Sequence, residues 1–450
     1  MPFALVNGSA VGLVPILLPV ISVRYGVGHV GLVMGAFNLG AFAAPLTGAF
    51  ADRFRAYRTT AVACAAICAV SLWLFPLAGP ALQLLLALLD GAGFAGAVTV
   101  ANLLVVERHP KAEWDARLGW LETVLSVGQG CALLLAAWLS TLSARNALLI
   151  GAFVPAAAIP LAAVLIRRAP EAPGAPAPSP EDRARPPHHL ARLGQVGEWG
   201  PASPSRVHHL PRHRNPLAAA RKVLGGGFGW MLAAWMPAYA GTAIIFTLYP
   251  VLFSHSFGIP PQTSALAFAG IVFASLPLFI VAGRVSQRRG PVLAMADAMA
   301  ARVVLLGLLA GLAAVGHVPA VLPLAAFAGI MFAWSFLSVA SPALTAQLVP
   351  GAEGDAQGLL NASSGLAGLV GSVAGGEVAS AWGYPAALAL GAASVAVGLA
   401  IFMATVARQA TRNLAQGSLL LPGRTSSRDI SAGCYASGAT RATCRCASRA

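Results

Sequence analysis

The sequence predicts an all-α integral membrane protein, with about twelve transmembrane helices in two pseudo-symmetric halves of six. The 450-residue chain is 57% hydrophobic and only 10% charged, whereas soluble domains carry about 25% charged residues. Its apolar residues form runs of about 20, the length of a helix that crosses a bilayer. A polar stretch interrupts these runs near the middle of the chain, which divides the predicted helices into two sets.

Each apolar run is expected to be a helix, because lipid offers no hydrogen-bond partner to the backbone of an irregular segment. Two of the runs are longer than a perpendicular crossing requires, so we expect 226–253 and 320–348 to tilt, kink or project beyond the lipid. In chain order, the predicted cores are 2–22, 31–51, 59–78, 82–104, 120–142, 147–166, 226–253, 263–283, 292–315, 320–348, 358–381 and 385–407.

Two regions are too polar to bury a core. The first is rich in Pro, Ala, Arg and His, as in Pro-Glu-Ala-Pro-Gly-Ala-Pro-Ala-Pro-Ser-Pro at 170–180, a composition typical of disordered linkers. The C-terminal tail is similar. The predicted organisation is an N-terminal half at 1–166, a linker at 167–224, a C-terminal half at 225–407 and a tail at 408–450.

The basic residues set the expected orientation. With the N-terminus inside, 26 of the 29 Lys and Arg residues fall in cytoplasmic loops, the linker or the tail, as the positive-inside rule requires. We therefore expect a multi-pass protein of the plasma membrane with both termini in the cytoplasm. The net charge of +14 fits attraction to anionic lipid, and no basic soluble module indicates nucleic-acid binding.

A short motif recurs in the loops after the second and eighth spans. The first copy reads Gly-Ala-Phe-Ala-Asp-Arg-Phe-Arg-Ala-Tyr-Arg at 48–58, and the second reads Gly-Arg-Val-Ser-Gln-Arg-Arg-Gly at 283–290. Gly48 and Gly283, and likewise Asp52 and Gln287, occupy equivalent positions. Each copy is predicted to form a tight, basic cytoplasmic turn, and its place in each half indicates an internal duplication.

The architecture and this loop resemble the major facilitator superfamily, whose signature between spans 2 and 3 is Gly-x-Leu-Ala-Asp-Arg-x-Gly-Arg-Lys. Gly48, Ala51, Asp52 and Arg53 match it, whereas Arg55 stands where the second glycine is expected. The resemblance implies that the loop latches the two halves in an outward-open state, with Glu107 as the acidic partner. Simple topological anchoring by arginines is the alternative. The expected gating residues are Gly48, Asp52, Arg53, Arg55, Arg58, Glu107, Gly283, Gln287 and Arg288.

Polar residues within the spans are candidates for substrate or ion contact, because each is costly in lipid. Asp90, about 12 Å into its span at 1.5 Å per residue, is the first candidate for a proton-linked or cation-binding carboxylate. The resemblance implies that the ninth span lies at the periphery, so Arg302 is expected to be structural, bonded to neighbouring carbonyls. The uncharged candidates are Asn7, Asn38, Gln129, Tyr239, Trp334 and Asn361. Hydrogen bonding between helices is the alternative role for each of them.

Other features of the spans concern packing. Small residues at 365, 368, 371, 375 and 376, all glycine, predict close helix contacts in the eleventh span. Trp73, Trp138, Trp230 and Trp382 are expected at the membrane–water interface. The cysteines within spans, at 64, 68 and 131, are expected to be small buried hydrophobes.

No motif indicates an enzyme, a metal site or a cofactor. The chain lacks Gly-x-x-x-x-Gly-Lys-Ser/Thr, Gly-x-Ser-x-Gly and His-Glu-x-x-His, so the sequence gives no sign of ATP-driven transport or hydrolytic chemistry. We expect a secondary active transporter of a small molecule, with protons as a candidate partner and proton-coupled efflux as one version. The arginine that proton-driven drug antiporters carry in span 4 is absent here. A non-transporting receptor, sensor or scaffold is the main alternative, an integral-membrane enzyme is the second, and a monomer is expected.

Overall fold

The computed structural model describes residues 2–54, 56–108, 114–166, 224, 226–316, 318–349 and 353–407, and the regular elements among them are all helical. The linker predicted at 167–224, apart from Leu224, and the tail predicted at 408–450 lie outside these residues. The described residues form one helical unit.

The N-terminal half contains six spans, two of which are broken. Its helices are α1 (Pro2–Ser22), α2 (Val27–Gly40) continued by the short 3-10 helix η2 (Ala41–Ala43) and α3 (Ala44–Arg53), α4 (Tyr57–Leu74), α5 (Pro80–Arg108), α6 (Trp114–Leu139), and α7 (Ala144–Gly151) continued by α8 (Phe153–Leu165). Each break lies four residues before a proline. Pro45 and Pro155 have no N–H to bond the carbonyls of Ala41 and Gly151, so the helix changes geometry there.

The C-terminal half contains six longer helices. They are α11 (Gly227–Phe257), α12 (Pro261–Arg289), α13 (Pro291–Val315), α14 (Val321–Leu348), α15 (Glu353–Trp382) and α16 (Tyr384–Phe402), which ends in a π-helical turn (Met403–Ala407). A single glycine joins α12 to α13 and α15 to α16. Gly290 has φ +86° and Gly383 has φ +85°, a region that side chains other than hydrogen disfavour.

The two copies of the repeated loop are more helical than the sequence predicts. In the first copy α3 continues to Arg53, and in the second α12 continues to Arg289. The turn in the second copy is therefore Gly290 alone rather than the stretch from Gly283. Proline at the first position of α13 favours a helix start directly after that glycine.

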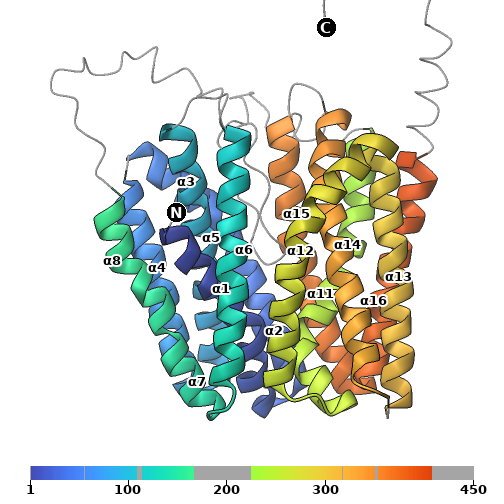
Figure 1. The fold of residues 1–450 in the computed structure, drawn as a ribbon, viewed down its shortest axis with the longest axis horizontal. Coiled ribbons are helices and arrows are strands. Elements are labelled where there is room, and N and C mark those ends of the chain that lie inside the picture. The colour runs from blue at the N-terminus through green and yellow to red at the C-terminus, as the bar shows by residue number, and fades with distance from the viewer. Residues whose placement is uncertain are drawn as a thin grey trace, which may run out of the picture. The chain divides into compact units, whose positions relative to one another are not determined.

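Among the described residues, ten helices or helix pairs are long and apolar enough to cross a membrane. The other two predicted spans are α2 with its continuation, which includes a shorter apolar helix at Val27–Ala43, and α15, which has 30 residues. Together they give the twelve-span, all-α membrane fold that the sequence predicts. Figure 1 shows the N-terminal half, blue to teal, beside the C-terminal half, green to red.

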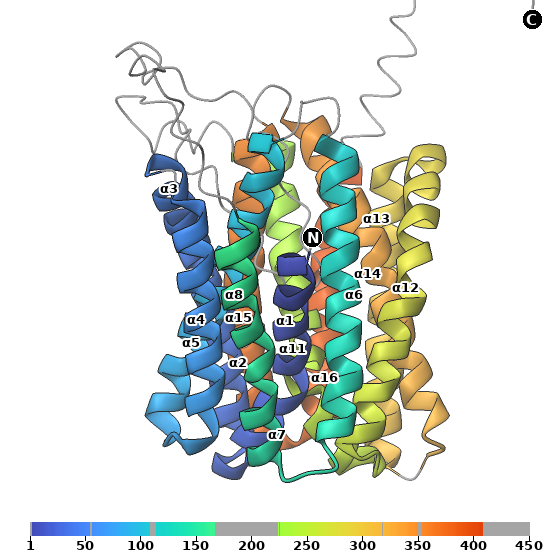
Figure 2. The same ribbon diagram turned by 60° about the vertical axis from the view of Figure 1, so that its left-hand side comes forward.

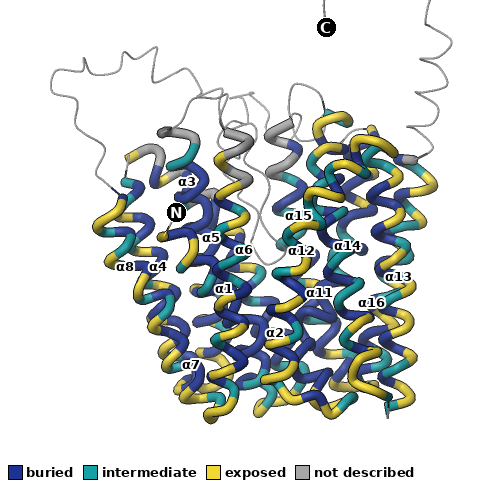
Figure 3. The backbone as a smooth tube through the Cα atoms, viewed as in Figure 1, coloured by how far each residue is buried: buried dark blue, intermediate teal, exposed yellow. Residues whose placement is uncertain are grey.

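The halves meet along two helix pairs and at the middle of the bundle. Helix α2 packs on α15, and α6 packs on α12, while α1 contacts α11; in Figure 2, α1 and α11 lie near the centre of the bundle. Figure 3 shows that buried residues face the interior of the bundle and exposed ones its periphery. Trp73, Trp138, Trp230 and Trp382 are all exposed, as expected of interfacial residues, but Cys131 is also exposed and not buried as predicted.

Candidate functional site

The interface between α2 and α15 brings two backbones almost into contact. A Cβ atom on Gly31 would lie 2.5 Å from the carbonyl oxygen of Ser372 and 2.8 Å from the Cα atom of Gly376. Gly371 faces the other way, and a Cβ atom there would collide with the carbonyl of Ala240 in α11. The glycines of α15 thus allow close packing on two sides, as the sequence predicts.

One serine links both halves by hydrogen bonds within this interface. The amide Nδ2 of Asn38 in α2 donates to Ser372 Oγ over 3.2 Å, and Thr247 Oγ1 in α11 donates to the same oxygen over 2.7 Å. Ser372 is completely buried. Hydrogen bonds between helices satisfy polar groups that lipid cannot, so this junction favours the conformation observed here.

A pocket lies beside this junction, and we call it the central pocket. Its volume in this conformation is about 20 Å³, which is room for about one water molecule. It unites three of the residues that the sequence singles out: Asn38, Tyr239 and Trp334. The lining residues are Asn38, Tyr239, Thr242, Ala243, Phe246, Thr247, Trp334 and Gly368. One comes from the N-terminal half and seven from the C-terminal half, so the pocket lies where the halves meet.

Aromatic rings form one wall of the central pocket. Trp235, Tyr239 and Trp334 make an aromatic cluster, with ring centroids 5.9 to 6.3 Å apart, within the range of favourable ring contacts. The indole of Trp235 donates to Ser364 Oγ over 2.7 Å. By contrast, Nε1 of Trp334 is buried and has no hydrogen-bond partner in the described part of the chain. Trp334 thus lines the pocket and carries an indole N–H that is not yet hydrogen-bonded.

Behind this wall lies Arg302, on α13. Its side chain is only 2% exposed, and its guanidinium donates to Thr242 Oγ1 over 3.0 Å and to the carbonyl of Ile330 over 3.4 Å. The guanidinium carbon lies 5.3 Å from the ring centroid of Trp334. The expected bond to a neighbouring carbonyl is present, while a structural role stays a prediction. The sequence does not predict the contacts of Arg302 with Thr242 and Trp334, which line the pocket. The depth of a charged residue within a span is the signal that could have indicated them.

Asp90 lies deep in α5 but does not line the central pocket. It is 3% exposed, and its Oδ2 has no hydrogen-bond partner among the described residues. The thiol of Cys68, in α4, donates to the Asp90 backbone carbonyl over 3.5 Å. The neighbouring Gly91 faces the backbone of Phe37 in α2. These contacts place the carboxyl within the N-terminal half, between α5 and the helices packed on it.

The other uncharged candidates are also outside the central pocket. Asn7 in α1 is 4% exposed, and its Nδ2 has no partner in the described part of the chain; the same holds for Nε2 of Gln129 in α6. The backbone of Gln129 packs on Gly12 of α1. Asn361 in α15 is 9% exposed. The structure does not bring these three residues together with Tyr239 and Trp334.

The expected gating residues lie at the α3 end of the bundle. Gly48 is buried in α3, Arg58 is half-buried in α4, and Gln287 and Arg288 are exposed on α12. Gly283 has open space where a Cβ atom would be. Arg55 and the side chains of Asp52, Arg53 and Glu107 lie outside what the structure describes. Within the described part, α3 packs mainly on α4, α5 and η2 of its own half.

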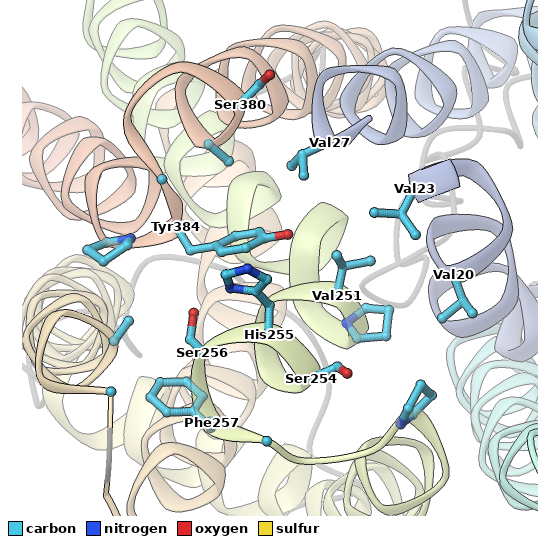
Figure 4. A pocket seen from close by; sticks show the side chains of 18 of the residues that line it. Val20, Val23, Val27, Val251, Ser254, His255, Ser256, Phe257, Ser380 and Tyr384 are labelled. Atoms are coloured by element: carbon cyan, nitrogen blue, oxygen red, sulfur yellow. The ribbon is translucent and has the colours of Figure 1, made fainter. Parts of the chain in front are cut away.

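At the opposite end of the bundle the halves enclose a larger cavity, which we call the vestibule. Its volume is about 1210 Å³, and it is lined by the α1–α2 junction of one half and by the ends of α11, α15 and α16 of the other. Figure 4 shows His255 beside Tyr384, with ring centroids 5.1 Å apart, facing Val23 and Val27 across the cavity. Val251 lines the vestibule and Thr247 the central pocket. One turn of α11 therefore separates the two cavities.

Twelve spans in two packed halves, with a pocket where the halves meet, define a membrane transporter. The sequence matches the family model of the Major Facilitator Superfamily over residues 1–296 and 231–426. The chain belongs to that superfamily. No curated protein matches it in sequence.

Solved structures of transporters share the fold. The nucleoside transporter NupG is similar with a TM-score of 0.65 at 14% identity, over 89% of this chain and 97% of that one. A bacterial homologue of the human lysosomal transporter Spinster, inward-facing and unoccupied, gives 0.63 at 15% identity, over 90% and 93%. The xylose transporter XylE from E. coli, partially occluded and inward-open, gives 0.61 at 11% identity, over 89% and 95%.

Proposed function

We propose that this protein is a secondary active transporter, which moves a small molecule across the plasma membrane by alternating access and binds it in the central pocket. The observation that carries the proposal is the composition of that pocket. Asn38 from one half and Thr247, Tyr239 and Trp334 from the other converge there. A polar, aromatic pocket between two packed halves is the arrangement expected of a binding site whose access changes when the halves rock.

The interface supports a rocking movement of the halves. At Gly31 the α2–α15 contact is backbone to backbone, whereas at Gly35 the side chains of Leu369 and Val373 of α15 pack against α2. Gly31 itself has no side chain that must be withdrawn from α15 when the two helices separate. In the predicted orientation the vestibule faces the outside, and the one turn of α11 beside Thr247 forms part of the outer barrier.

The loops at the α3 end are proposed as the inner gate. Gly48 is buried in α3, so the motif belongs to a packed helix and not to a free loop. When the halves close at this end, the carboxylate of Asp52 and the basic residues after it would meet groups of the opposite half or Glu107. The release of these contacts opens the cytoplasmic side.

Asp90 is the proposed site of proton coupling. Its carboxyl is buried and lies away from the central pocket, so it would act on the helix arrangement of the N-terminal half and not by touching the substrate. We propose that the inward proton gradient drives efflux of the substrate. In this proposal both chain termini lie in the cytoplasm.

Flux into proteoliposomes tests the proposal. Purified full-length protein is reconstituted, and uptake of a panel of labelled metabolites and drugs is followed with and without a pH gradient. Asn38→Ala should abolish or strongly reduce the flux that the wild type shows. Asn146→Ala, the same change at an exposed residue of α7, should not. If the correctly inserted wild type moves no member of the panel, the receptor or scaffold alternative is favoured.

A further inference from the structure

A buried cation stands behind the aromatic wall of the central pocket. Arg302 does not line the pocket, but its guanidinium lies 5.3 Å from the ring of Trp334 and hydrogen-bonds Thr242. Both of these residues do line it. The positive charge thus acts on the pocket through one layer of side chains.

This charge is felt in the pocket because little water intervenes. Arg302 is 2% exposed and Trp334 is 8% exposed, and unit charges interact several-fold more strongly in such surroundings than in water. The face of Trp334 towards Arg302 already serves a cation–π contact. A second cation in the pocket would be repelled by the guanidinium. It also could not use the face of Trp334 that Arg302 already occupies.

The hydroxyl groups of Thr242 and Thr247 in the pocket already use their protons. The hydroxyl of Thr242 donates to the carbonyl of Ala238 over 2.9 Å while it accepts from Arg302, so its proton is already used. Thr247 donates to Ser372. A donor that remains is Nε1–H of Trp334, which is buried without a partner among the described residues, and a buried donor left unpaired costs about 1–3 kcal/mol.

The shape of the wall favours a ring. Tyr239, Phe246 and Trp334 are three of the eight lining residues, and their faces offer stacking surface. Because the pocket holds only about 20 Å³ in this conformation, a ring can enter only when the halves move apart and the pocket widens.

We infer that the central pocket selects a ring-bearing compound that accepts a hydrogen bond and carries no positive charge, and that Arg302 sets this preference from behind the pocket wall. The inference rests on the proposed function, since the pocket must be the substrate site. Arg302 is then a specificity-determining residue on a helix that does not line the pocket. Trp334 supplies the donor, and the aromatic cluster supplies the stacking surface.

One ring in three charge states tests this inference. Nicotinamide is neutral, nicotinate is an anion and 1-methylnicotinamide is a cation, and each is titrated into the purified full-length protein in lipid nanodiscs to obtain Kd. We expect the cation to bind roughly tenfold or more weakly than the other two. Arg302→Gln, which keeps a donor for Thr242 and Ile330 but removes the charge, should bring the three affinities close together. Arg302→Lys should keep the preference.

Three further variants separate the roles. Arg145→Gln, the same change at an exposed arginine of α7, should leave all three affinities unchanged. Trp334→Phe keeps a ring but removes the N–H, so it should weaken nicotinamide and nicotinate about tenfold while the cation remains the weakest ligand. Thr242→Val keeps the Arg302 charge and should also keep the preference.

The outcomes distinguish this inference from the proposed function. Binding of the cation as tight as that of nicotinamide, failure of all three compounds to bind, or an Arg302→Gln variant with unchanged preference would overturn the inference, even in a protein that shows flux. The expected preference in a protein without flux would support the ligand preference of the pocket and would favour the receptor or scaffold alternative over transport.

Discussion

At the scale of single residues, the hydroxyl of Ser372 is where the two halves and the central pocket meet. It accepts hydrogen bonds from Asn38 of one half and Thr247 of the other, and both donors line the pocket. Of these two bonds, the one from Asn38 joins the two halves, so a substrate that takes this donor for itself weakens the contact between them. Substrate binding and opening of the interface are therefore expected to be coupled at this oxygen.

Ser372→Ala should favour separation of the halves. Loss of a hydrogen bond of this kind shifts an equilibrium by about 0.5–1.5 kcal/mol, which is up to about tenfold. Accessibility of a single cysteine placed at Val27, in the vestibule, to an impermeant maleimide measures the shift, in a background without the native cysteines. Ser338→Ala, at a serine that donates to the carbonyl of Ser335 in its own helix, serves as the control. Equal labelling rates in the two variants would contradict the prediction.

Asp90→Asn tests proton coupling. The change keeps the size and most hydrogen bonds of the side chain but prevents it from carrying a proton on and off. We expect accumulation driven by a pH gradient to disappear while passive exchange of substrate continues, both measured in proteoliposomes. Asp297→Asn, at an exposed carboxyl of α13, should behave like the wild type. Continued uphill accumulation by the Asp90 variant would rule it out as the coupling residue.

The sequence predicts some of these residues better than others. Polarity within a span is enough to single out Asn38, Tyr239 and Trp334. The direction in which a side chain points depends on helix rotation, which packing decides. Asp90 is predicted to lie inside its span and is buried within α5, but the close contacts of Gly91 and Gly93 with α2 and α4 fix the side that it faces. The tie between Arg302 and Trp334 depends on how α13 packs behind α14.

At the scale of helices, α15 is the element on which both the pocket and the interface depend. Its glycines face α2 of the N-terminal half on one side and α11 of its own half on the other, so the helix packs closely against both halves. The sequence predicts that this helix packs closely, because small residues recur along it. It does not predict the partners, since the same spacing would suit any neighbouring backbone.

Gly31→Ala should push α2 and α15 apart. The added methyl group would meet backbone atoms at 2.5 Å and 2.8 Å, and overpacking of this kind costs about 1–3 kcal/mol. We expect faster maleimide labelling at the vestibule and a lower transport rate. Gly307→Ala in α13 adds the same methyl group where no atom lies within 4 Å, so it should change neither. A Gly31 variant that labels and transports like wild type would show that the interface is not tight.

At the scale of the whole molecule, the hydrophobic pattern predicts the twelve spans and their order, and the family match confirms the architecture. The pattern does not predict the breaks in the second and sixth spans. Apolar residues continue on both sides of Pro45 and Pro155, so the pattern does not mark the break, while the missing backbone donor changes the helix geometry locally. Contacts between helices that are distant in the sequence also cannot be predicted from the hydrophobic pattern.

The orientation of the molecule gives a direct prediction. Cysteines placed within 170–222 and after residue 408 should react with impermeant maleimide only after the cytoplasmic side is opened, because 26 of the 29 basic residues lie on that side in the predicted topology. A cysteine at Gly79, between α4 and α5, should react in intact cells. Labelling of the linker in intact cells would reverse every loop assignment.

The position of Arg302 also bears on how the chain enters the membrane during synthesis. A charged side chain at the centre of a helix costs about 2.5–3.5 kcal/mol on insertion. Of the groups that Arg302 contacts, Thr242 is made before α13, whereas Ile330 and Trp334 follow it on α14. When α13 leaves the ribosome, Thr242 on α11 is already available to the guanidinium, whereas Ile330 and Trp334 are not. The stretch rich in Leu, Val and Ala that follows Arg302 must therefore keep α13 in the bilayer until α14 is inserted. The residue that tunes the pocket thus also makes the insertion of α13 depend on α14.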